Sequence, residues 1–125
     1  MHNAGFALYG PPELITSLEA AQAAAQALRA EELDLVVVFQ ATFADSTMVN
    51  ALARTLSAPL FLWAVPEAAS GGRLRLNSLC GINLAGHSLT RQGISYEYAL
   101  CPPQDPQVIS QLRPLAQAGQ VRRRL

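Results

Sequence analysis

The chain has 125 residues, a length typical of one domain that can bury a substantial core. Half of the residues are hydrophobic and 14% are charged, which is typical of a folded domain and excludes a disordered one. Nine basic and nine acidic residues cancel, so we expect neither nucleic acid nor a membrane as a partner. No stretch has the roughly 18 apolar residues that span a bilayer, and no signal peptide is visible, so we expect a cytoplasmic protein.

The first third of the chain predicts a strand, a helix and a second strand. Phe6–Tyr9 is a short apolar run that a Gly-Pro-Pro sequence ends. Thr16 and Glu19 have the spacing of a capping box and predict a helix through residues 20–29, whose apolar face is mostly alanine. Residues 35–39 read LVVVF, an unbroken apolar run typical of a strand that is covered on both faces.

The same alternation continues to the end of the chain. The predicted elements are a helix capped by Asp45 or Ser46 and ended by Pro59, a strand over 60–65, a helix over 77–92, a strand over 95–100 and a helix over 106–117. Pro114 should weaken the last helix, and Gly119 should end it. Regular alternation of buried strands and helices predicts one α/β domain over residues 1–125. We expect a three-layer α/β/α sandwich with a mainly parallel sheet, flavodoxin-like or Rossmann-like.

No recognised catalytic motif is present, so the candidate site depends on Trp63 and Glu67. Both residues lie where the predicted strand 60–65 ends, and ligands of open α/β sheets bind at that end of the strands. In a functional interpretation the indole stacks on a sugar face and the carboxylate accepts hydrogen bonds from hydroxyl groups. In a structural interpretation Trp63 packs in the core and Glu67 caps a loop. The sequence leaves both interpretations open.

The other polar residues carry weaker signals. Gln40, Thr42 and Asp45 flank the end of the predicted strand 35–39, while Asn77 and Ser78 could cap the helix that they begin or bind an anion there. His87 has no partner at helical spacing, so packing or surface exposure explains it better than a ligand role. Cys80 and Cys101 are too few and too far apart for a disulfide framework or a zinc site, so we expect free, buried thiols.

Three segments resemble a known family: ATFADSTMVNALA, PLFLWAVPE and GGRLRLNSLCGINLAGHSLTRQG. Together they are similar to the amino-terminal domain of the L-fucose/L-arabinose isomerase-like proteins, over about Leu33 to Tyr98. The resemblance implies a protein that interconverts an aldose and a ketose with a divalent metal, usually manganese. It also implies that the metal ligands and the acid/base pair lie in further domains, which this chain lacks, so that the chain alone is inactive.

The resemblance also assigns a role to the candidate residues. It implies that this domain supplies one wall of the substrate cleft, often to a neighbouring subunit. Trp63 would correspond to the cleft tryptophan of the family, with Glu67 as a weaker candidate beside it. We expect the chain to lack the family's opening strand and helix, and a parallel sheet with a missing strand keeps an unpaired edge. We therefore expect a carbohydrate as the substrate and a homo-oligomer as the assembly.

Two other functions fit the same sequence. The first is a non-catalytic module that holds a sugar or an anion at the strand ends and signals to a partner. The second is an assembly domain in which Trp63 is simply buried.

Overall fold

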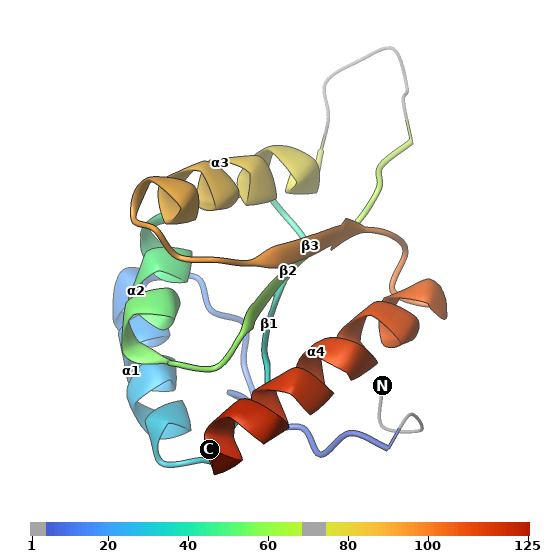
Figure 1. The fold of residues 1–125 in the computed structure, drawn as a ribbon. Helices are drawn as coiled ribbons and strands as arrows, with labels where there is room; N and C mark the ends of the chain where they lie inside the picture. The colour runs from blue at the N-terminus through green and yellow to red at the C-terminus, as the bar shows by residue number, and fades with distance from the viewer. Residues whose placement is uncertain (1–4, 69–74) are drawn as a thin grey trace.

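A computed structural model describes residues 5–68 and 75–125, and within these ranges it contains four helices and three strands (Figure 1). In chain order the elements are α1 (Leu18–Arg29), β1 (Val36–Gln40), α2 (Thr47–Thr55), β2 (Leu60–Ala64), α3 (Ser78–Arg91), β3 (Glu97–Leu100) and α4 (Gln107–Arg124). The Gly-Gly part of the family resemblance lies outside the described residues.

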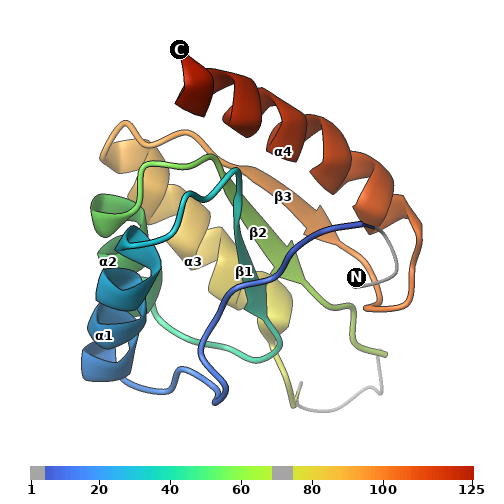
Figure 2. The ribbon, with the colours of Figure 1, turned by 90° about the horizontal axis from the view of Figure 1, so that it is seen from below.

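The three strands form one parallel sheet in the order β1-β2-β3, with Val36 beside Leu60 and Phe61 beside Glu97. α2 and α3 connect consecutive strands and lie on one face of this sheet, whereas α4 covers the other face (Figures 1 and 2). The predicted α/β fold is therefore confirmed.

The core on the α2/α3 side is aliphatic. Leu60, Leu62 and Ala64 of β2 alternate toward this side and meet Ile82 and Leu89 of α3. α1 lies beside α2 rather than on the sheet (Figure 2), and its buried residues are Ala21, Ala24 and Ala25. The small side chains thus bring two helices together, where the sequence predicted a helix lying on the sheet.

The core on the α4 side contains the large aromatic residues. Phe61 and Trp63 alternate toward this side of β2 and pack against Val108 and Leu112 of α4. Phe39, which projects toward the same side from β1, keeps 46% of its surface exposed. α4 therefore covers the aromatic core but leaves the end of β1 partly open.

Three predicted details are wrong. Phe6–Tyr9 is no strand, since these residues have no backbone partner in the sheet, although Phe6 packs against the core on the α4 side. Ser17, not Thr16, caps α1, because its hydroxyl accepts a hydrogen bond from the Ala20 backbone N–H at 3.1 Å. α4 also continues well past residue 117.

Gly119 explains the length of α4. It lies buried inside the helix, and a methyl group at this position would overlap the carbonyl oxygen of Asp34. The glycine therefore permits a close approach between α4 and the start of β1 and does not end the helix. Arg123 holds the same region, because its guanidinium pairs with Glu32 and Asp34 at 2.9 Å.

Candidate functional site

The carboxyl edge of the sheet is the candidate site, because polar side chains from separate elements meet there. Gln40 is the last residue of β1, Glu67 follows β2, and Ser78 begins α3. The Ser78 hydroxyl accepts a hydrogen bond from the Val65 N–H at 3.0 Å and donates one to the Gln40 carbonyl oxygen. One buried hydroxyl thus joins the ends of both strands to the start of α3.

The side chain of Gln40 fills the space beneath the first turn of α3. The residue is 7% exposed, and its Nε2 lies 3.4 Å from the carbonyl oxygen of Ala44. A methyl group at Gly81 would overlap this amide, so the glycine makes room for it. Among the described residues nothing donates a hydrogen bond to Gln40 Oε1. A water molecule or a hydroxyl group is the kind of donor that could satisfy this oxygen.

Glu67 binds the backbone of the segment that leads into α3. Its carboxylate accepts hydrogen bonds from the backbone N–H groups of Arg75 (2.9 and 3.1 Å) and Leu76 (3.0 and 2.6 Å). The Phe43 N–H in turn donates to the Leu76 carbonyl oxygen at 2.7 Å, which joins the clamp to the loop after β1. The geometry is that of the loop-capping alternative, and a contact between Glu67 and a substrate stays a prediction.

Trp63 lies in the core on the α4 side and is 5% exposed. Its Nε1–H donates to the Cys101 carbonyl oxygen at 3.0 Å, and Phe39 meets the indole edge-on with 4.9 Å between ring centroids. The indole thereby fixes the carboxyl end of β3 to β2. Stacking on a sugar would require the indole to leave this cluster, so the predicted substrate contact of Trp63 stays a prediction.

Two of the weaker polar candidates act locally. Asp45 accepts hydrogen bonds from the backbone N–H and the hydroxyl of Thr47, and these bonds lower the pKa of its carboxyl group. It therefore supports the start of α2, as one of the predicted alternatives states. Asn77 has a left-handed backbone, with φ of 55°, and its side chain makes no capping bond to α3.

The histidine and the cysteines do not meet at this edge. His87 is exposed on α3. Cys80 is exposed in the first turn of α3, so the prediction of a buried thiol is wrong for this residue. Cys101 is buried, and burial raises the pKa of its thiol, with a further rise from the charge of Asp105. Residues 5–68 and 75–125 bring no three His, Cys, Asp or Glu side chains together.

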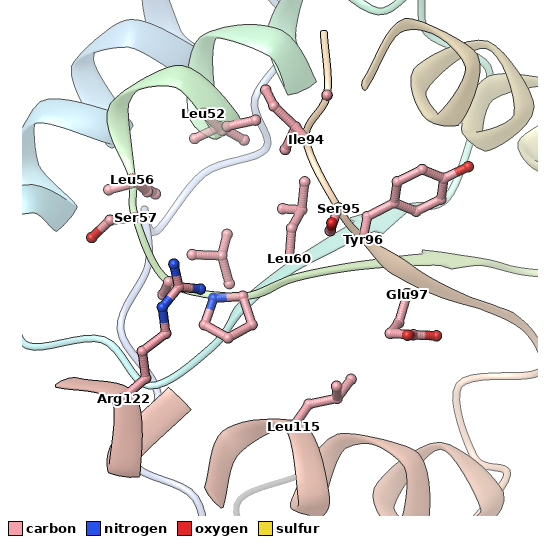
Figure 3. A pocket seen from close by; sticks show the side chains of 15 residues that line it. Leu52, Leu56, Ser57, Leu60, Ile94, Ser95, Tyr96, Glu97, Leu115 and Arg122 are labelled. Carbon is pink, nitrogen blue, oxygen red and sulfur yellow. The ribbon is translucent and has the colours of Figure 1, made fainter. Parts of the chain in front are cut away.

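A cavity of about 410 Å³ lies at the opposite, amino end of the strands (Figure 3). Its apolar lining includes Leu52 of α2, Leu60 of β2 and Leu115 of α4, and Glu97 and Arg122 supply opposite charges. The sequence did not predict this cavity, because its lining comes from five elements, β1, α2, β2, β3 and α4, that no local pattern connects.

None of the described helices is both long enough and apolar enough to cross a membrane.

Comparison with known proteins defines the family. Residues 2–125 match the model of the fucose/sulfoquinovose isomerase N-terminal domain. The chain belongs to this family, which confirms the resemblance found in the sequence.

Curated relatives include the sulfoquinovose isomerase of Priestia megaterium, which is 30% identical over 95 residues, 76% of this chain and 21% of the relative. The sulfoquinovose isomerase of Alkalicoccus urumqiensis is 34% identical over 102 residues, 82% of this chain and 23% of the relative. The chain thus spans between one fifth and one quarter of the length of these relatives. No solved structure matches.

Proposed function

We propose that this chain forms one wall of the substrate cleft in a sugar isomerase that interconverts an aldose and a ketose. Family membership supports the class of protein, and the names of the relatives favour sulfoquinovose as the sugar. The observation that carries the proposal is the polar carboxyl edge, where Gln40, Glu67 and Ser78 meet at the end of a parallel sheet.

At this edge the chain would bind and orient the sugar. Gln40 Oε1 has no donor among the residues that the structure describes, so a sugar hydroxyl that reached it after a small movement of the 41–44 loop would supply one. Glu67 acts indirectly, because its carboxylate holds Arg75 and Leu76 and so fixes the start of α3. Trp63 acts indirectly too, by holding the end of β3.

The proposal makes the chain catalytically incomplete. Manganese in the whole enzyme would polarise the sugar oxygens during proton transfer. The described residues do not gather the carboxylate and histidine ligands for it, so binding and orientation are the contributions assigned to this chain.

A chimera tests the proposal. Residues 1–125 replace the corresponding domain of the Priestia megaterium sulfoquinovose isomerase, and turnover of sulfoquinovose is measured with manganese present. We expect an active chimera and an inactive isolated chain. Turnover by the isolated chain would overturn the incompleteness, and a folded but inactive chimera would favour a non-catalytic module.

Glu67→Gln in the chimera tests whether the carboxyl edge of the sheet faces the sugar. The variant weakens the clamp on Arg75 and Leu76, so we expect KM to rise several-fold with little change in Tm. Glu31→Gln is the matched control, since Glu31 is exposed and lies near Pro59, at the amino end of the strands. An unchanged KM in Glu67→Gln would show that the carboxyl edge does not face the sugar.

A further inference from the structure

The amino end of α3 has free backbone donors at the carboxyl edge of the sheet. The backbone N–H groups of Leu79 and Cys80 donate to no residue within 5–68 or 75–125, and both residues are exposed. Asn77 precedes the helix, but its side chain makes no capping bond, and the first turn contains no acidic residue. The free N–H groups at the start of a helix carry partial positive charge, which favours an anion there.

The other three described helices have acceptors of their own. In each of them a side-chain oxygen accepts a hydrogen bond from a backbone N–H group at the start of the helix. These oxygens belong to Ser17 at α1, Asp45 at α2 and Asp105 at α4, at distances of 3.1, 3.0 and 2.9 Å. In the described part of the chain α3 begins without such an acceptor, so its donors are left to water or to a ligand.

A buried amide without a full set of partners lies against the same turn. Gln40 is 7% exposed, and a methyl group at Gly81 would overlap its Nε2, so the side chain is directed at the first turn of α3. No described residue donates a hydrogen bond to Gln40 Oε1. Because a buried oxygen without a donor is costly, this atom favours a ligand that carries a hydroxyl group.

These two features match one end of the sugar that the relatives are named for. Sulfoquinovose carries a sulfonate group on its terminal carbon, and in the open-chain form the neighbouring carbon carries a hydroxyl group. The sulfonate is a permanent anion that only accepts hydrogen bonds, whereas the hydroxyl can also donate one. A helix end supplies donors for the first group, and an amide oxygen supplies an acceptor for the second.

We propose that the amino end of α3 binds the sulfonate end of the sugar. The N–H groups of Leu79 and Cys80 donate to the sulfonate oxygens, and the neighbouring hydroxyl donates to Gln40 Oε1. This inference rests on the proposed function, and it adds the part of the sugar that this domain recognises.

The charged side chains at this edge are compatible with an anion. Arg75 is exposed, and its guanidinium forms no ion pair with a described residue. Glu67 is the opposing charge, but both of its oxygens already accept hydrogen bonds from the N–H groups of Arg75 and Leu76. The guanidinium of Arg75 therefore offsets the carboxylate of Glu67 beside the proposed site.

Small sulfonates test the site in this chain without any turnover. Isethionate carries a hydroxyl on the carbon next to the sulfonate-bearing carbon, as the sugar does, whereas ethanesulfonate lacks this hydroxyl. Each is titrated into the isotope-labelled chain and followed by NMR. We expect the amide signals of Leu79 and Cys80 to shift with both probes, and to saturate at a several-fold lower concentration of isethionate.

The amides of Thr47 and Gln107 are internal controls, since each is already bonded to an aspartate at the start of a helix. No shift at Leu79 and Cys80, or an equal shift at all four amides, would overturn the sulfonate site. Equal affinities for the two probes would overturn the contact between the hydroxyl and Gln40.

Gln40→Leu tests that contact separately. Leucine keeps most of the buried volume and removes the acceptor, and the backbone carbonyl that Ser78 binds is retained. We expect the affinity for isethionate to fall to the affinity for ethanesulfonate. An equal loss of affinity for both probes would contradict the hydroxyl contact, because the amide would then only position the helix.

Leu79→Glu tests the anion site in the chimera. A carboxylate in the first turn competes with the sulfonate for the helix end, and it also interacts favourably with the helix dipole, so the variant should stay folded. We expect KM for sulfoquinovose to rise several-fold without a fall in Tm. Leu79→Gln has the same shape as Leu79→Glu without the charge and should raise KM less.

Equal KM values for the two Leu79 variants in an active chimera would overturn the sulfonate site and leave the isomerase proposal intact. An inactive parent chimera would count against the isomerase proposal, whereas the titration with small sulfonates would still test the site. The two failures can therefore be told apart.

Discussion

The two faces of the sheet are closed in different ways. On one face α2 and α3 pack aliphatic side chains against β1 and β2, and glycines in α3 let Gln40 and Tyr96 lie close to the helix. On the other face a single helix covers the aromatic core and leaves Phe39 partly exposed. Two helices thus cover the first face. The core on the second face is formed by Trp63 together with residues of α4 and with Phe6 of the N-terminal segment. The aromatic core and the partly exposed Phe39 therefore lie on the same side of the sheet.

Trp63→Ala should have the largest effect, because it empties the centre of the α4 side. We expect a loss of about 3–5 kcal/mol in the free energy of unfolding, measured by urea denaturation. Trp63→Phe keeps most of the apolar volume and loses the hydrogen bond to Cys101, so it should cost far less. If Trp63→Ala unfolded at nearly the wild-type urea concentration, the indole would not be a core residue.

Gly119→Ala tests how closely α4 approaches β1. The added methyl group meets the backbone of Asp34, which cannot rotate away, so we expect a loss of about 1–3 kcal/mol. Gly10→Ala is the control, since nothing lies near a methyl group there. Equal thermal stability of the two variants would argue against the close contact.

These two residues also show what the sequence could predict. Strand and helix alternation was readable, because continuous apolar runs and capping residues are local signals. Gly119 was misinterpreted because a glycine late in a helix resembles a terminator, and the carbonyl that it accommodates comes from a distant segment.

The candidate site was only partly predictable for a similar reason. The sequence placed Gln40 and Glu67 at strand ends and Ser78 at the start of a helix, and the structure brings them to one edge. The sequence could not show that α4 packs against Trp63, since no local pattern determines which face of the sheet a later helix covers. The cavity between Glu97 and Arg122 had no sequence signal either.

Arg123→Ala should weaken the end of α4 only slightly. Its pairs with Glu32 and Asp34 are partly exposed, and such pairs contribute about 0.2–1 kcal/mol. The loss should shrink in high salt, because salt screens exposed charges. Arg124→Ala is the control for the change in net charge, because Arg124 lies at the same helix end and forms no ion pair with a described residue. A salt-independent loss would point to packing by the arginine stem.

Thiol labelling of the unmodified protein can compare an exposed cysteine, Cys80, with a buried one, Cys101. Cys80 should react quickly with a thiol reagent, whereas Cys101 should react only on unfolding, because burial raises its pKa and restricts access. A raised pKa favours the neutral thiol in the folded state. Stability should therefore fall slightly as the pH rises above the ordinary thiol pKa, where the unfolded thiol ionises first. Equal labelling rates would contradict the buried position of Cys101.

The most direct test of the sugar-facing wall is hydrogen exchange in the chimera, with and without saturating sulfoquinovose. The account predicts that sugar slows exchange in the backbone of residues 40–44 and 75–81, at the carboxyl edge. Residues 56–60 and 93–97, around the cavity at the amino end, should not change. Protection at the amino end alone, or none at either end in an active chimera, would contradict the account.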